Sequence, residues 1–207
     1  MWIDRFQPIL KSTLLLFFLG ILGFANAAPT DDPLAMLRSS TDDVLSVAYG
    51  GHGNENLAAR VRPVLEKSFA FDIVTRQAMG PGWRQFSPAE QKRVIDLFTE
   101  LVIRTYSARV VGTQRPKIAY GQPVEIAPDR REIPTRVTTS TDSQPISVVY
   151  RLVKLPTGWR TYDVLIEGVS FIANYRAQFD GIIQNGGAPA VIRTLESKLA
   201  ALADSHS

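Results

Sequence analysis

The fold of this chain is decided by one stretch, Gly158-Trp-Arg-Thr-Tyr-Asp-Val-Leu-Ile-Glu-Gly-Val-Ser-Phe-Ile-Ala-Asn-Tyr-Arg-Ala-Gln-Phe179. In its first half, Tyr162, Val164 and Ile166 recur at every second position among residues that favour strands. A glycine ends this alternation, and Ser170 is of a residue type favoured at helix N-caps. The apolar spacing then becomes helical, with one face formed by Phe171, Ile172, Tyr175, Phe179, Ile182 and Ile183. We therefore predict a strand that leads directly into a helix whose inward face carries three aromatic rings.

The chain begins with the features of an export signal. Arg5 and Lys11 precede a short apolar run over 14–24, and Ala25-Asn26-Ala27 fits a small-x-small cleavage site. The run is shorter than the about 20 residues that span a bilayer, so we expect cleavage near Ala27 rather than a retained anchor. We expect an exported protein, most simply a periplasmic one.

The mature chain, 28–207, is expected to form a single domain. We divide it into a helical part (28–115), a sheet (116–168) and closing helices (169–203). The whole chain has 23 Lys and Arg against 20 Asp and Glu, and loss of the leader leaves a net charge near +2. This charge supports contact with an anionic surface only weakly and does not argue for nucleic acid. The chain has no cysteine, which excludes thiol chemistry and metal–thiolate sites.

Four helices are predicted before the sheet. The first runs from Pro33, a residue favoured at the first helical position, to about Tyr49. The second covers 57–69 and contains Pro63, which we expect to kink or restart it. Asp72 is expected to cap a brief third helix.

The fourth helix has the clearest start in the first half of the chain. Ser87-Pro88-Ala89-Glu90 combines a capping box with a proline at the first helical position, and Gly112 is expected to end the helix. One face of it is apolar: Val94, Ile95, Phe98, Leu101, Val102 and Tyr106. We expect this face to pack against the interior.

After Pro116 the sequence becomes typical of strands. The predicted strands are 117–120, 124–127, 133–141, 146–155 and 159–167. Short turns separate them, which indicates an antiparallel meander rather than βαβ units. Two of the segments are apolar on both sides in places, which indicates a sheet covered on more than one face.

The fold class that follows is α+β. Two closing helices, Phe171–Ile183 and another that starts at Pro189, bring the total to about six. They cover a curled antiparallel sheet of four or five strands. Helices laid across one face of such a sheet would form a cone with a mouth.

The residues of catalysis and metal binding are nearly absent. The two histidines are His52, in a glycine-rich loop, and His206, in the terminal tail, so neither is held as a catalytic triad requires. Ser170 resembles a nucleophile elbow, but Ile172 stands where the second glycine belongs. No metal-ligand spacing and no phosphate loop is present. We expect no catalytic residue, no metal and no cofactor.

Two features allow more than one interpretation at this point. Asp163 and Glu167 lie four residues apart on one strand and could act as an acid–base pair, or could form ion pairs with Arg151, Arg160 or Arg176. The aromatic stripe could be ordinary core or the lining of a ligand pocket.

The residues Tyr162–Phe179 resemble the signature of the MlaC family of periplasmic phospholipid-shuttle proteins. A second matching block contains Phe71-Asp72, Ala78-Met79-Gly80 and Trp83-Arg84, and continues to Leu101–Tyr106. The resemblance spans roughly 69–199. The chain departs from the family pattern at Phe171, where a smaller aliphatic residue is common.

This resemblance implies an NTF2-like cone joined to a helical part, with an apolar cavity between them. It implies a non-enzymatic, monomeric carrier of phospholipid acyl chains that maintains the lipid asymmetry of the outer membrane. The implied partners are an inner-membrane ABC permease complex with its lipid-binding component and an outer-membrane lipoprotein–porin complex. Another lipid such as a hopanoid is an alternative cargo. A different class of function is an enzyme on a cone-shaped fold that uses Asp163 with Tyr175 or Tyr162.

A carrier of this kind must shield acyl chains from water. Each buried methylene contributes about 0.8 kcal/mol, so two long chains contribute about 20 kcal/mol or more. The predicted lining residues are Phe98, Leu101, Tyr106, Val148, Tyr150, Val164, Ile166, Val169, Phe171, Tyr175 and Phe179. Arg151, Arg160 and Arg176 are candidates for the rim or for partner contact, and equally for ordinary surface charges.

Overall fold

The structure is a computed structural model that describes residues 31–50, 56–110, 114–139 and 144–204 of the chain. The predicted export signal, the end of the fourth helix at Gly112, the turn at 141–143 and both histidines lie outside the described residues.

The described residues form an α+β fold, as predicted. The helices are α1 (Pro33–Tyr49), α2 (Leu57–Ser68), α3 (Phe71–Met79), the 3-10 helix η1 (Gly80–Gln85), α4 (Pro88–Val110) and α5 (Phe171–Asp204). The strands are β1 (Lys117–Tyr120), β2 (Val124–Ala127), β3 (Arg130–Thr138), β4 (Ile146–Leu155), β5 (Gly158–Ile166) and β6 (Val169–Ser170). Within the described residues the sheet has six strands rather than four or five, because the two-residue β6 pairs with the end of β5.

The sheet is antiparallel throughout its described pairs, but it is not a simple meander. Its order is β1-β3-β4-β5-β6, and β2 also pairs with β3. β1 pairs with residues 135–138 of β3 and β2 with residues 130–132, so the two short strands follow one another along the same edge. β3 begins at Arg130, earlier than the predicted 133, and this extra length leaves room for both.

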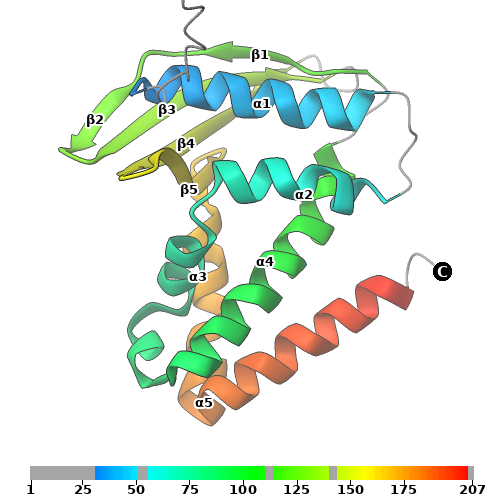
Figure 1. Cartoon of the computed structure of the whole chain (residues 1–207), viewed down its shortest axis with the longest axis vertical. Coiled ribbons are helices and arrows are strands. Elements are labelled where there is room, and N and C mark those ends of the chain that lie inside the picture. The colour runs from blue at the N-terminus through cyan, green and yellow to red at the C-terminus, as the bar shows by residue number, and fades with distance from the viewer. Residues whose placement is uncertain (1–30, 51–55, 111–113, 140–143, 205–207) are drawn as a thin grey trace, which may run out of the picture.

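Helices pack on both faces of the sheet. Ile133, Leu152 and Trp159 form a buried cluster with Leu37 of α1. Val153 and Tyr162 belong instead to a cluster with α3, α4 and α5. The prediction of a sheet covered on more than one face is therefore confirmed. Figure 1 shows the sheet and α1 at one end of the molecule and α3, α4 and α5 at the other.

Local signals at the helix starts are partly confirmed. Glu90 accepts hydrogen bonds from the Ser87 hydroxyl at 2.7 Å and from the Ser87 backbone N–H at 2.8 Å, the second of which the capping box requires. The hydroxyl contact first, and then the backbone contact, lower the pKa of Glu90. Asp72, however, lies inside the first turn of α3 and caps nothing. The backbone N–H of Ala70 bonds to the carbonyl of Thr161 on β5, at 2.9 Å, and Ala70 is the N-cap, so the helix starts two residues earlier than a cap at Asp72 would place it. The prediction for Asp72 is therefore wrong.

The predicted breaks within two helices have different outcomes. α2 continues through Pro63 without a restart. The proline removes only one intrahelical hydrogen bond, and its loss does not end the helix. In α5, Gly187 has φ 57° and ψ −154°, which are not helical, and it divides the element near the predicted boundary. The two closing helices are therefore present as two segments of α5.

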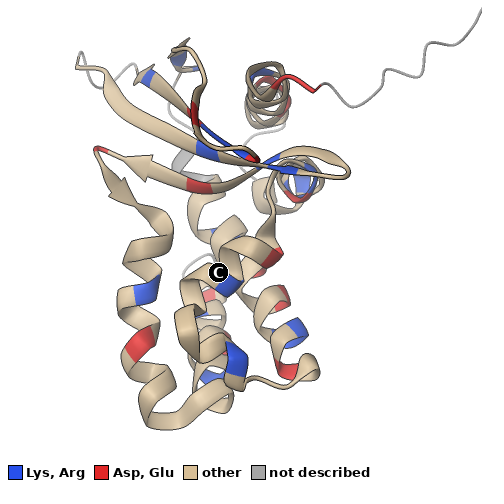
Figure 2. Cartoon of the chain, turned by 90° about the vertical axis from the view of Figure 1, so that its left-hand side faces the viewer, with Lys and Arg blue, Asp and Glu red and all other residues tan. Residues whose placement is uncertain are grey.

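The described helices include none that is long and apolar enough to cross a membrane. Figure 2 shows acidic and basic residues interspersed over the sheet and the helices in that view, without a face of one sign.

Candidate functional site

The aromatic stripe of α5 packs against α4. The ring of Phe98 on α4 lies 4.9 Å from Tyr175 and 5.7 Å from Phe179, in edge-to-face contacts that stabilise aromatic pairs. Phe171 lies 4.7 Å from Tyr175 and 5.5 Å from Tyr106, between ring centroids. Phe98 is fully buried and Phe179 is 2% exposed, so this cluster is filled by its own side chains. Leu101 belongs to the same buried cluster.

The other predicted lining residues lie elsewhere. Val148 and Tyr150 pair with Ile166 and Val164 across β4 and β5. Cross-strand partners share a face, and alternation puts these four on the same face as Leu152, which packs against α1. Ile166 is 51% exposed, and its partner Val169 on β6 is 65% exposed. The structure thus divides the predicted lining between two sides of the sheet, and whether either part contacts a ligand stays a prediction.

Asp163 is a structural anchor. It is 4% exposed, and its carboxylate accepts hydrogen bonds from the Ser170 hydroxyl at 2.7 Å and from the Ile172 backbone N–H at 3.1 Å. Arg151 lies 3.4 Å from it. The carboxylate therefore holds the first turn of α5 against β5. Ser170 also accepts from the Ala173 N–H at 3.1 Å, which confirms it as a helix cap.

The second carboxylate of the candidate pair, that of Glu167, does not join Asp163 and its partners. Glu167 has φ 49°, at the turn after β5, and it accepts from the backbone N–H of Ser147. Asp163 instead shares Arg151 with Glu132, whose carboxylate is 2.8 Å from that guanidinium. The hydrogen bond with Glu132 is the main reason that the pKa of Arg151 is raised. Of the two interpretations of the carboxylates, the ion pair fits this geometry.

A pocket of about 420 Å³ lies beside Asp163. Three guanidinium groups line it, those of Arg130, Arg151 and Arg176. Arg176 donates two hydrogen bonds to the carbonyl of Gln77, at 2.9 and 2.6 Å, and Arg130 stacks 4.7 Å from the ring of Tyr162. Arg151 and Arg176, two of the three predicted rim arginines, therefore line the same pocket. Both are already bonded to other groups of the protein.

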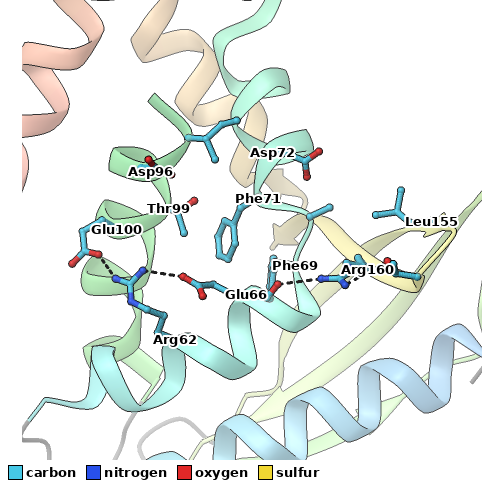
Figure 3. Close-up of a pocket in the computed structure, with 13 residues that line it drawn as sticks. Arg62, Glu66, Phe69, Phe71, Asp72, Asp96, Thr99, Glu100, Leu155 and Arg160 are labelled. Carbon is cyan, nitrogen blue, oxygen red and sulfur yellow. Dashed lines mark hydrogen bonds and ion pairs between the residues drawn. The ribbon is translucent and has the colours of Figure 1, made fainter. Parts of the chain in front are cut away.

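A larger pocket of about 520 Å³ lies between α2, the start of α3, α4 and the β4–β5 turn (Figure 3). Its apolar lining residues are Phe69, Ala70, Phe71, Ile95 and Leu155. The rings of Phe69 and Phe71 stack with centroids 5.6 Å apart. Its charged lining residues are Arg62, Glu66, Asp72, Asp96, Glu100 and Arg160.

Of these pocket residues, sequence reasoning selected only Arg160 as a candidate. The guanidinium of Arg160 donates to the Glu66 carbonyl at 3.1 Å and to the Thr157 hydroxyl at 3.4 Å. The signal that could have led to the rest is the Phe69-Ala-Phe71 connection between two short helices. These two aromatic residues stand two positions apart at the junction of α2 and α3.

Thr99 on α4 is the unusual polar group of this pocket. It is 7% exposed, and among the described residues its hydroxyl oxygen has no hydrogen-bond partner. Thr99 and Phe71 face each other across the pocket (Figure 3). A buried hydroxyl without a partner costs about 1–3 kcal/mol, so a ligand that pairs with it gains that free energy back.

No group of three or more metal-ligating side chains occurs among the described residues.

Comparisons with known proteins identify the fold. A solved structure of a phospholipid-binding protein from Ralstonia solanacearum, in complex with a phospholipid, matches with a TM-score of 0.75 and 28% sequence identity. The match covers 83% of this chain and 99% of that chain. No curated protein matches the chain. A family model described as MlaC protein matches residues 38–197, which is most of the 207 residues and confirms the resemblance noted in the sequence. The chain therefore belongs to the MlaC family.

Proposed function

We propose that this protein is a phospholipid carrier that shields acyl chains in its apolar interior. The observation that carries the proposal is the likeness to the Ralstonia phospholipid-binding protein, whose structure contains a phospholipid and matches over nearly its full length. Membership of the MlaC family supports the same proposal.

The interior has to open for this function. A diacyl lipid is larger than the ligands that pockets of about 300–1,000 Å³ usually hold, and the larger pocket is about 520 Å³. The aromatic cluster of α4 and α5 is closed in this structure. Bound chains therefore have to separate packed helices, and the burial of about 0.8 kcal/mol per methylene is the free energy available for doing so.

The carrier acts, in this proposal, in the periplasm after the leader is removed near Ala27. It moves lipid as a monomer between an inner-membrane ABC permease complex and an outer-membrane lipoprotein–porin complex, and so maintains outer-membrane lipid asymmetry. Intact-mass measurement of the protein from a periplasmic fraction tests the first step. We expect the mass of a chain that starts near Ala28, and the full-length mass would contradict it.

An enzymatic role for Asp163 is less well supported. Its carboxylate is taken up by Arg151, Ser170 and the start of α5. A group so fully engaged is poorly placed to exchange protons with a substrate.

Mass spectrometry of the organic extract of purified protein is the direct test. We expect diacyl phospholipid in near-stoichiometric amount, and native mass spectrometry should show the corresponding mass on the folded protein. A ring-fused lipid in its place would support the hopanoid alternative. An extract without lipid, together with no uptake from phospholipid vesicles, would reject the carrier proposal.

A further inference from the structure

We infer that the hairpin of β5 and β6 docks this protein on the surface of anionic phospholipid bilayers. This inference builds on the proposed function, to which it adds a surface that contacts membranes. The hairpin turns at Glu167 and Gly168, whose φ angles of 49° and 79° are both positive, as in the two-residue turns that join antiparallel strands tightly. Among the described residues, nothing lies within 4 Å of the place where a Cβ at Gly168 would stand. The turn therefore faces open space.

Two apolar side chains beside this turn form what we call the hairpin patch. Ile166 and Val169 are cross-strand partners, so their side chains lie together on one face of the hairpin. Ile166 is 51% exposed and Val169 is 65% exposed. Residues that line a closed cavity are shielded from water, whereas contiguous exposed apolar side chains favour contact with something outside the protein. The hairpin patch therefore belongs to the outer surface.

The acidic side chain of the turn does not extend from it. The carboxylate of Glu167 accepts a hydrogen bond from the backbone N–H of Ser147 on β4. This bond holds the carboxylate against the sheet. The hairpin therefore presents its apolar pair and its glycine to the outside, with the negative charge drawn back.

Two basic side chains lie at the same end of the sheet as the hairpin. Arg136 is the register partner of Ser147, and Lys117 is that of Thr138, the last residue of β3. Both cations are exposed, and within the part of the chain that the structure describes neither has an ion pair. Basic side chains near an anionic bilayer are attracted to it. The charge of this end therefore suits an anionic lipid surface.

A second exposed apolar pair provides a comparison. Val124 and Ile126 on β2 are 52% and 45% exposed. Between them stands Glu125, which pairs with Arg131 at 2.7 Å. The charges beside this pair are thus already balanced, and an anionic surface gains little from contact with it.

The hairpin patch is too small for a stable protein partner. Specific protein–protein interfaces bury roughly 800 Å² on each partner, contributed by about 20–30 residues. Two side chains beside a tight turn can instead enter the headgroup level of a bilayer, where attraction to anionic lipids adds to the burial of apolar surface. A bilayer is therefore the partner that fits both the patch and the cations.

Flotation with vesicles of phosphatidylethanolamine and phosphatidylglycerol tests the docking. Ile166→Ser with Val169→Ser removes the hairpin patch, and Val124→Ser with Ile126→Ser is the matched control on β2. We expect the hairpin variant to lose about tenfold or more in vesicle partition and the β2 variant less than about twofold. Because all four positions are exposed, both variants should keep the circular dichroism of the parent.

The charges are tested in the same assay. Arg136→Gln with Lys117→Gln should lower vesicle partition about fivefold or more, and the difference from the parent should vanish at about 1 M salt. Arg193→Gln with Lys198→Gln is the control, because these two exposed cations of α5 also have no ion pair in the described ranges. An equal loss in the control would show a general attraction of charge and would contradict the docking orientation.

A fluorescent probe on the hairpin keeps the test independent of serine substitutions. The chain has no cysteine, so Val169→Cys and Val124→Cys each provide one labelling site for an environment-sensitive nitrobenzoxadiazole group. On addition of the vesicles, we expect the emission from the hairpin label to shift to the blue and to be quenched by nitroxide-labelled lipid. The emission from the β2 label should stay unchanged.

Equal partition of the hairpin and β2 variants, or a hairpin label that remains in water, would overturn the inference. Failure of the parent protein to float with the vesicles would overturn it as well, and would leave the patch as a contact for another protein. None of these results bears on the carrier proposal, which the lipid content of the organic extract decides. Vesicle docking by a protein whose extract holds no lipid, and which takes up none, would support the inference and reject the carrier proposal.

Discussion

At the residue scale, Asp163 connects the strand and the helix of the deciding stretch. Its buried carboxylate accepts hydrogen bonds from the Ser170 hydroxyl and the Ile172 N–H and pairs with Arg151. Local sequence specifies the order of strand, turn and helix. The contacts of the Asp163 carboxylate then hold α5 at a set angle to the sheet.

Removal of that carboxylate should therefore be costly. We predict that Asp163→Ala lowers the free energy of unfolding by about 2–4 kcal/mol, because a buried hydrogen-bonded charge is lost and its donors are left unpaired. Urea denaturation measures the change. Glu167→Ala, at an exposed position in the same hairpin, is the control, with a loss below about 1 kcal/mol. Equal losses in the two variants would show that Asp163 is not the anchor.

Tyr150 makes the protein sensitive to alkaline conditions. Burial, followed by the electrostatic effect of nearby Tyr120, raises the pKa of Tyr150 to about 12. An unfolded tyrosine titrates near pH 10, so this contribution to stability is complete below about pH 10 and is lost as the pH rises toward 12. We predict that the free energy of unfolding of Tyr150→Phe falls less between pH 9 and 12 than that of the parent, by up to about 3 kcal/mol. Urea denaturation of both proteins at several pH values tests this. An equal change of the free energy of unfolding with pH in the two proteins would contradict it.

The predicted lining can be tested one residue at a time. Val164→Arg should abolish lipid co-purification while the protein stays soluble, because a guanidinium group in a lipid-filled space costs more than the chains gain. Tyr175→Glu should act in the same way from the helical side. Val124→Arg is the control, since Val124 is 52% exposed on β2. A folded Val164→Arg or Tyr175→Glu protein that retains its full lipid content would show that the lining assignment is wrong.

At the element scale, α5 depends on one backbone break. Gly187 has φ 57°, a conformation that residues with a Cβ rarely adopt, and the two segments of α5 diverge there. Gly181 lies within the first segment, where an added Cβ would meet nothing within 4 Å.

These two glycines should respond to alanine in opposite ways. Gly187→Ala should destabilise the protein by about 1–2 kcal/mol, because the left-handed conformation is strained for alanine. Gly181→Ala should stabilise it by about 0.5–1 kcal/mol, because alanine favours the helix. Thermal unfolding of both variants provides the comparison. A Gly187→Ala protein that is as stable as the parent, or more stable, would show that the break at Gly187 is not required.

At the scale of the whole molecule, two apolar clusters meet at the larger pocket. One is the aromatic cluster of α3, α4 and α5, and the other is the cluster of α1, α2 and α4. A lipid that binds only the folded protein must stabilise the fold as a whole.

We predict a large thermal shift on lipid binding. At a free lipid concentration of 100 times Kd, linkage adds about 2.7 kcal/mol of stability. For a domain of this size this corresponds to a rise in Tm of about 5–10 °C. The comparison is between delipidated protein and the same protein reloaded from vesicles, followed by circular dichroism. A Tm that does not respond to reloading would contradict binding in the interior.

The sequence by itself determined the main helices, the five longer strands, the capping box at Ser87, the division of the closing helix and the family to which the chain belongs. These features depend on periodicity and on contacts a few residues apart, which the order of residues specifies directly. Only the tertiary structure decided that β1 and β2 share the edge of β3 and that the predicted lining lies on two sides of the sheet. It also decided that the larger pocket lies between α2 and α4. Those outcomes depend on the pairing and packing of residues far apart in the chain, such as Arg62 with Glu100 and Ala70 with Thr161, and no local pattern encodes such contacts.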